Sequence, residues 1–214
     1  MKIMITGFDP FGGEPVNPAY EAVKLLPDEI EGAQIIKLEV PTVFGKAGEA
    51  LEAAIAACQP DAVLCVGQAG GRSGMSVEKV AINYQDARIP DNENRQPVDK
   101  CIKKDGQTAY FATIPVKAVT AKMRENGIPA FISYSAGTYV CNDLMYSLLY
   151  LIDKKYPQMR GGFIHVPFAM QQAVDKPNGT PCMSLDAIAK GLACAVCAII
   201  ENKEDISQAM GTTH

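Results

Sequence analysis

The stretch that decides the fold is DAVLCV, residues 61–66, which runs directly into the glycine-rich loop GQAGGR, residues 67–72. An uninterrupted apolar run of this length is typical of a strand buried inside the sheet of an α/β protein. The loop matches neither the dinucleotide-binding nor the P-loop spacing of glycines. We therefore expect it to allow close approach of the backbone to a small ligand or to another chain segment.

Strands and helices alternate on both sides of this run. The pattern predicts strands at residues 2–6, 34–40, 61–66, 75–83 and 131–133 and within 160–167, and helices at 17–26, 45–58, 116–126, 138–156 and 184–204. The polar stretch 84–108 is expected to be a functional loop or a local hairpin, and 168–181 a loop. This alternation predicts a three-layer α/β/α sandwich with a mostly parallel, twisted sheet. We expect one domain over residues 1–205 and a flexible tail over 206–214.

Composition excludes several classes of function. The 214 residues are 48% hydrophobic and carry a formal net charge of −4, with no basic cluster, so we expect one sizeable core and no nucleic-acid partner. No apolar run is long enough to cross a bilayer, and the N-terminus lacks the apolar core and cleavage site of a signal peptide. The seven cysteines are scattered, so we expect reduced thiols and a cytoplasmic location.

A cysteine stands where an apolar helix is predicted to begin, in the segment Ser135 to Asn142. Gly137 permits a sharp turn, and Thr138 is the predicted N-cap, which places Cys141 in the first helical turn. Unpaired N–H groups and the helix dipole at that position favour an anion, lower the pKa of a thiol and make it a nucleophile. The alternative is a small buried hydrophobe, as most free cysteines are.

The sequence has two histidines, and His214 is the terminal residue, which we expect to be disordered. His165 is thus the imidazole base candidate, and it lies at the carboxyl end of a predicted strand, where ligands bind in α/β sheets. The loops that follow the strands bring Phe8, Phe11 and Gln68 to the same edge, and Cys141 is expected to face it. A core histidine with satisfied hydrogen bonds is the alternative. One histidine and dispersed cysteines disfavour a transition-metal site.

Glu78 is the candidate orienter for that base, because the apolar residues around it predict partial burial of its carboxylate, which then needs a partner. The alternative is an edge-strand glutamate paired with Lys79 or Arg72. The C-x-x-C pair at Cys194 and Cys197 lies deep in an apolar helix, whereas a redox pair belongs at a helix start, so we assign it to the core.

Six ordered blocks carry a resemblance that covers nearly the whole chain. They are TGFDPFGG (6–13), GQAGGR (67–72), EKVAIN (78–83), DARIPDN (86–92), AGTYVCN (136–142) and GGFIHVP (161–167). The chain resembles the type I pyroglutamyl peptidase family, also called pyrrolidone-carboxylate peptidases, which are cysteine peptidases. The resemblance implies an α/β/α sandwich, a cytosolic and often tetrameric protein, N-terminally pyroglutamylated peptides as partners, and no metal or cofactor.

The same resemblance implies roles for individual residues. The family's catalytic residues fall on Glu78, Cys141 and His165. Its pyroglutamate pocket falls on Phe8, Phe11, Thr42, Ile89, Tyr139 and Val140, with Asn17, Gln68 and Arg88 close by.

The chain departs from the family pattern in places. Tyr139 stands where the family usually has Phe, Tyr134 where Asn is common, and Asp143 where His is common. Ala169-Met170 replaces a usual Leu-Pro.

Two other functions remain open at this point. One is an amidase or acyltransferase that uses the same three residues on another small acyl group. The other is an inactive relative that binds blocked N-termini.

Overall fold

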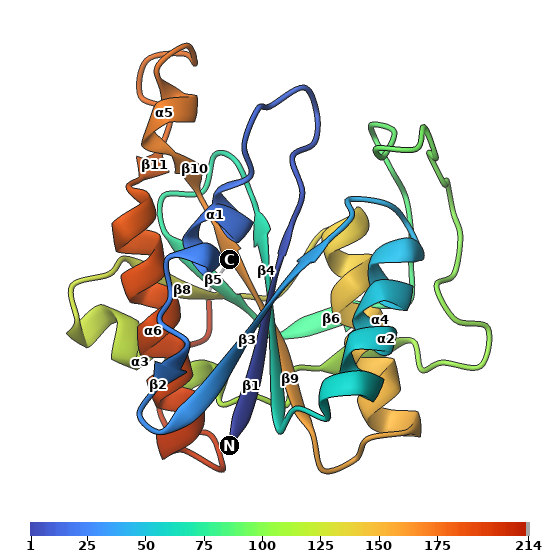
Figure 1. The fold of residues 1–214 in the computed structure, drawn as a ribbon. Coiled ribbons are helices and arrows are strands. Elements are labelled where there is room, and N and C mark those ends of the chain that lie inside the picture. The colour runs from blue at the N-terminus through green and yellow to red at the C-terminus, as the bar shows by residue number, and fades with distance from the viewer. Residues whose placement is uncertain (213–214) are drawn as a thin grey trace.

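A twisted seven-stranded sheet forms the centre of the molecule in the computed structural model, which describes residues 1–212 (Figure 1). Its strand order is β2-β3-β1-β4-β9-β5-β8. The strands are β1 (Lys2–Phe8), β2 (Glu29–Ile30), β3 (Ala33–Val40), β4 (Ala62–Gln68), β5 (Met75–Glu78), β8 (Ala130–Ser133) and β9 (Arg160–Val166). β1, β3, β4 and β9 run parallel, whereas β2 and β5 pair antiparallel with β3 and β9.

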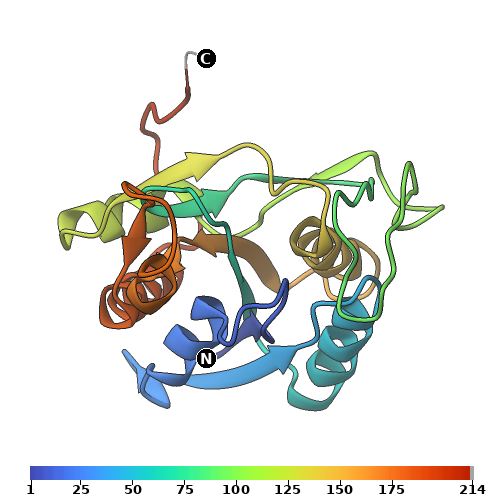
Figure 2. The ribbon, with the colours of Figure 1, turned by 90° about the horizontal axis from the view of Figure 1, so that it is seen from above.

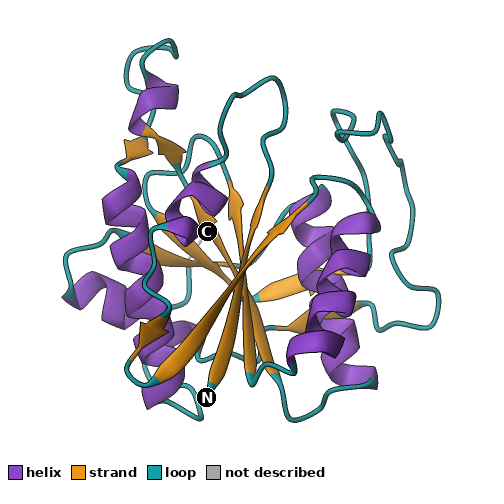
Figure 3. Ribbon diagram, in the orientation of Figure 1, coloured by secondary structure: helices purple, strands orange, loops and turns teal. Residues whose placement is uncertain are grey.

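Helices cover both faces of this sheet, which confirms the predicted three-layer α/β/α arrangement (Figures 2 and 3). One face carries α2 (Lys46–Cys58) and α4 (Val140–Lys154), and the other carries α1 (Pro18–Lys24), α3 (Val116–Glu125) and α6 (Leu185–Glu201). The sequence signals for two helix starts are confirmed: the side chains of Asn17 and Ser184 accept hydrogen bonds from the backbone N–H groups of Ala19 and Ala187. α6 ends three residues before the predicted boundary at Glu204.

The predicted strand 75–83 is wrong as one element. It divides at Lys79 into β5 and β6 (Val80–Ile82), and β6 leaves the main sheet to pair with β7 (Ala109–Phe111). The cause is a non-local contact: the side chain of Asn142 accepts a hydrogen bond from Ile82 N and donates to Ile82 O and Tyr84 O. These bonds attach the chain after β5 to the beginning of α4.

Two loop predictions also need correction. Residues 168–181 are not loop throughout, because they contain β10 (Phe168–Ala169) and α5 (Met170–Ala173), and β10 pairs with β11 (Cys182–Met183). Between residues 84 and 108 the only regular pairing in the described structure is one isolated bridge, Gln85 to Lys100. Buried Asp91 holds this segment by accepting hydrogen bonds from Phe44 N, Glu93 N and Arg95 N.

β8, the strand before α4, does not end at the edge of the sheet where β9 ends. This differs from the expectation that the carboxyl ends of the strands meet at one edge. β5 and the outermost strand β8 run parallel to each other and antiparallel to β9, so β8 runs away from the edge where β9 ends and stops level with Glu78. Residues 134–139 then return the chain to the edge where β9 ends. The N-cap of α4 is Tyr139 rather than Thr138, whose hydroxyl instead donates to Asp86 O.

Among residues 1–212, no helix combines the length and the apolar character needed to cross a membrane. Residues 206–212 contain neither helix nor strand, and His214 lies outside the described residues.

Gly7 is required by the packing of α1 on β1. A Cβ at this position would lie 2.5 Å from Tyr20 Cα, which is backbone and cannot rotate away. We expect Gly7→Ala to force the helix off the sheet and to lower the free energy of unfolding by about 1–3 kcal/mol. Urea unfolding measures this loss. The control is Gly211→Ala, where the nearest atom to the new Cβ is 4.0 Å away, and equal stability of the two variants would contradict the packing argument.

Candidate active site

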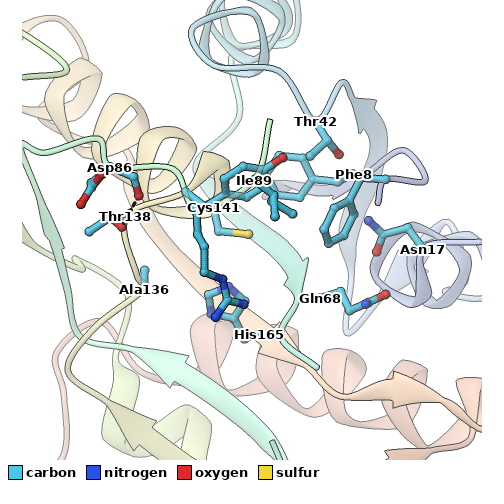
Figure 4. A pocket seen from close by; sticks show the side chains of 13 residues that line it. Phe8, Asn17, Thr42, Gln68, Asp86, Ile89, Ala136, Thr138, Cys141 and His165 are labelled. Atoms are coloured by element: carbon cyan, nitrogen blue, oxygen red, sulfur yellow. Dashed lines mark hydrogen bonds between the residues drawn. The ribbon is translucent and has the colours of Figure 1, made fainter. Parts of the chain in front are cut away.

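The carboxyl ends of β1, β4 and β9 meet at one edge of the sheet, where they face the beginning of α4 across a cavity of about 310 Å³ (Figure 4). β1 contributes Phe8, β4 contributes Gln68, and β9 contributes His165. Cys141, in the first turn of α4, lies in the wall between them. The position predicted for Cys141 is therefore confirmed, although the residue that caps its helix is not the predicted one.

The position of the Cys141 thiol depends on Gly67. A Cβ on Gly67 would lie 2.9 Å from the Cys141 sulfur and 2.7 Å from the ring of Phe163. Gly67 is also the register partner of His165 on the neighbouring strand. Because glycine has no side chain, residue 67 leaves space for the Cys141 sulfur next to β9, the strand that carries His165.

Glu78 is completely buried and hydrogen-bonded to His165, with 2.7 Å between Glu78 Oε1 and His165 Nδ1. The same oxygen accepts a hydrogen bond of 2.6 Å from the guanidinium of Arg72, which also donates to Ser135 O. Arg72 and Lys79 were the two alternative ion-pair partners of Glu78. Arg72 forms an ion pair with Glu78, and Lys79 does not. Glu78 is no surface glutamate, however, because burial of its carboxylate requires these positive partners.

These contacts set the protonation states of the site. Nδ1 of His165 donates to the Glu78 carboxylate, so Nε2 carries the lone pair when the ring is neutral. Burial lowers the pKa of His165; its hydrogen bond to the Glu78 carboxylate raises this pKa, and the charge of Arg72 lowers it further. The imidazole is therefore neutral at pH 7 and can accept a proton.

Burial and the nearby charge of Glu78 raise the pKa of the Cys141 thiol to about 12, although Arg72 acts in the opposite direction. The expectation that the helix dipole would lower this pKa is wrong. Desolvation outweighs the dipole there, since the sulfur occupies the space beside Gly67 where a side chain would otherwise lie.

Most of the predicted pocket residues line this cavity. They are Phe8, Phe11, Asn17, Thr42, Gln68, Arg88, Ile89 and Tyr139. Val140 does not line it, because its side chain is fully buried in the core. Asp86, Ala136 and Thr138 line the cavity but were not predicted. A hydrogen bond between the Thr138 hydroxyl and Asp86 O joins two of them, and no local pattern signals this contact between segments far apart in sequence.

Comparisons with known proteins agree with this architecture. A family model described as pyroglutamyl peptidase matches residues 1–202. The chain belongs to the pyroglutamyl peptidase family.

Among its relatives, the pyrrolidone-carboxylate peptidase 1 of Streptococcus pneumoniae serotype 4 is 57% identical over the full length of both chains. The pyrrolidone-carboxylate peptidase of Enterococcus faecalis is 58% identical, again over both full lengths. The crystal structure of pyroglutamyl peptidase I from Bacillus amyloliquefaciens matches with a TM-score of 0.94 and 46% identity, covering 97% of this chain and 99% of that one.

One departure from the family pattern has a structural explanation. The hydroxyl that Tyr139 adds donates to Pro90 O at 2.9 Å. The Tyr139 ring packs edge-on against Phe44 and tilted against Phe11. The hydroxyl therefore holds the segment that carries Arg88 and Ile89 and is already bonded to backbone, so it adds no free donor to the cavity.

The positive charge of Arg72 holds down the pKa of His165, because it disfavours an imidazolium and withdraws negative charge from Glu78. Removing that charge should therefore raise the pKa. We expect an NMR titration to place the pKa of His165 below 6.5 in the wild type and at a higher pH in Arg72→Met. Only one other histidine, His214, contributes a signal.

Two variants complete this test. Arg72→Lys should keep most of the shift, and Lys79→Met, which removes a neighbouring cation that rests over the Phe111 ring, should leave the pKa unchanged. An identical pKa in Arg72→Met and wild type would show that Arg72 has no electrostatic influence on the base.

Proposed function

We propose that this chain hydrolyses the peptide bond that follows an N-terminal pyroglutamyl residue, with Cys141 as nucleophile, His165 as base and Glu78 as the residue that orients His165. The observation that carries the proposal is the arrangement of three side chains. Cys141 and His165 line one cavity, and Nδ1 of His165 is hydrogen-bonded to the buried Glu78 carboxylate. Nucleophile, base and orienter form the arrangement that acyl transfer requires. Family membership and the names of the relatives support the substrate class.

Proton transfer accompanies the attack in this mechanism, because thiol and imidazole are both neutral at pH 7. Nε2 of His165 takes the thiol proton as the Cys141 sulfur attacks the pyroglutamyl carbonyl carbon. Glu78 stabilises the imidazolium that forms and fixes the ring orientation. His165 then gives the proton to the leaving amine, which leaves a thioester on Cys141, and water attacks that thioester with His165 again as base.

The oxyanion is stabilised at the beginning of α4. The backbone N–H of Cys141 belongs to the first helical turn, where N–H groups have no partner within the helix. A second donor from Arg88 or Gln68, both of which line the cavity, completes the oxyanion hole. Loss of one such donor typically costs about 3 kcal/mol of transition-state stabilisation.

The cavity has two sides relative to Cys141. Phe8, Asn17, Thr42 and Gln68 lie on one side, and Asp86, Ala136 and Thr138 on the other (Figure 4). We assign the pyroglutamyl ring to the Phe8 side, which carries aromatic and neutral polar groups, and the departing peptide to the Asp86 side. The cytoplasmic location and the tetramer implied by the resemblance stay predictions.

Cys141→Ser should fold normally and lose at least ~10³ of kcat on a pyroglutamyl chromogenic amide, because a serine hydroxyl is a weaker acid and a weaker nucleophile than a thiol, so His165 removes its proton less readily. Cys194→Ser, in α6 away from the cavity, should retain activity. Substantial turnover by the Cys141 variant would exclude Cys141 as the nucleophile.

Prolyl amides should be cleaved with kcat/KM at least ~10³ below that of pyroglutamyl amides, which corresponds to about 4 kcal/mol. An N-terminal proline has a similar ring but carries an ammonium and lacks the ring carbonyl. The one lining carboxylate, Asp86, lies on the opposite side of Cys141, so the ammonium would be buried unpaired. Comparable kcat/KM for the two amides at pH 7 would contradict the assignment of the ring to the Phe8 side.

A further inference from the structure

We propose that Gln172, which does not line the cavity, determines which end of the Gln68 side-chain amide faces the substrate, and so selects an acyl ring that carries a carbonyl. This inference rests on the proposed function. It makes Gln172 a positioning residue for specificity, and it assigns the donor of Gln68 to the ring carbonyl rather than to the oxyanion.

Gln172 belongs to an arm formed by β10, α5 and β11, which stands above the sheet next to the loop that follows β1 (Figure 1). The ring of Phe168 seats this arm on Gly70, where a Cβ would lie 2.1 Å from the ring. Lys176 also pairs with Glu14 across 2.6 Å. The arm is therefore fixed to both of the loops that border the cavity on this side.

The hydrogen bonds of Gln172 fix the orientation of its own amide. Its Oε1 accepts a hydrogen bond of 2.9 Å from Ala169 N, and a backbone N–H can only donate. Its Nε2 lies 3.3 Å from Val16 O and 3.0 Å from Glu14 Oε2, which can only accept. Exchanging the oxygen and nitrogen of this buried amide would break all three bonds, so Gln172 has one orientation.

That orientation determines the orientation of Gln68. The two hydrogens of Gln172 Nε2 are shared among Glu14 Oε2, Val16 O and Gln68 Oε1, the last at 3.1 Å, so the atom of Gln68 that faces Gln172 must be an acceptor. The oxygen of Gln68 is thus directed to the arm, and its Nε2 is left for the cavity that Gln68 lines. Among residues 1–212, no acceptor is bonded to Gln68 Nε2.

The other polar side chains on this side of the cavity already have partners within the chain, although Asn17 keeps one N–H without a partner among residues 1–212. The Thr42 hydroxyl donates to Asp9 O. The Asn17 amide accepts from Ala19 N and donates to Asp9 O. Gln68 Nε2 and the second N–H of Asn17 Nδ2 are therefore the side-chain donors that this wall offers to a substrate, and we assign the ring carbonyl to Gln68 Nε2.

Reversing the direction of the Gln172–Gln68 bond tests this assignment. In the double variant Gln172→Glu with Glu14→Gln, the carboxylate at 172 still accepts from Ala169 N, and the new amide at 14 donates to it. Gln68 must then donate its Nε2 to residue 172 and present Oε1 to the cavity. The exchange keeps the total charge but removes the carboxylate partner of Lys176, a loss that the single variant Glu14→Gln reproduces. A purely structural role of Gln172 would affect all substrates equally.

The measurement is kcat/KM for pyroglutamyl and prolyl chromogenic amides. In the double variant we expect pyroglutamyl cleavage to fall about 10- to 100-fold, because the ring carbonyl meets an oxygen instead of a donor. Prolyl cleavage should fall less or rise, since the reversed amide accepts from the prolyl ammonium. The ratio of the two kcat/KM values should therefore fall at least about tenfold.

Two controls isolate the effect. Gln171→Glu adds a charge at the adjacent exposed residue of α5 and should leave the ratio unchanged. Glu14→Gln alone removes the partner of Lys176 but keeps the donor of Gln172, so its ratio should also be unchanged.

An unchanged ratio in the double variant would overturn the proposal. Absence of pyroglutamyl hydrolysis by the wild type would instead overturn the proposed function, so the two failures are distinguishable.

Discussion

The buried carboxylate of Glu78 is the constraint on which the rest of the site depends. A charge with no exposure to solvent persists only where positive or donor groups surround it, and here one oxygen accepts from both His165 and Arg72. Its other oxygen, Oε2, is buried and has no hydrogen-bond partner among residues 1–212. The carboxylate therefore depends on these two contacts, and they join β5, β9 and the loop after β4 into one unit.

The antiparallel placement of β5 beside β9 makes the Glu78–His165 contact possible. Glu78 is opposite Phe163 and Ser76 is opposite His165, so Glu78 and His165 are diagonal neighbours on one face of the sheet. On the other side of β9, β4 places Gly67 opposite His165. Three adjacent strands thus supply a carboxylate, an imidazole and a space for the sulfur, and α4 closes over the same face with Cys141.

The sequence predicted what depends on local patterns. Apolar runs identified the parallel strands, side-chain caps at Asn17 and Ser184 marked two helices, and the loops after β1, β4 and β9 reached the predicted edge. It did not predict the reversed direction of β5 and β8, the separation of β6 at Lys79, or Asp86 in the cavity wall. Each of these depends on a contact between distant segments, such as the bonds from Asn142 to Ile82 and Tyr84.

The raised pKa of Cys141 determines which negative charge the N–H groups at the beginning of α4 stabilise in the proposed mechanism. If the thiol were ionised at rest, the N–H groups of the first turn would stabilise the thiolate, and attack would have to give up that stabilisation. Burial instead keeps both thiol and imidazole uncharged. The N–H groups then meet full negative charge only when the oxyanion forms. Stabilisation that appears only in the transition state is the kind that raises kcat, so in the proposed mechanism desolvation of the Cys141 thiol favours turnover although it makes the resting thiol less acidic.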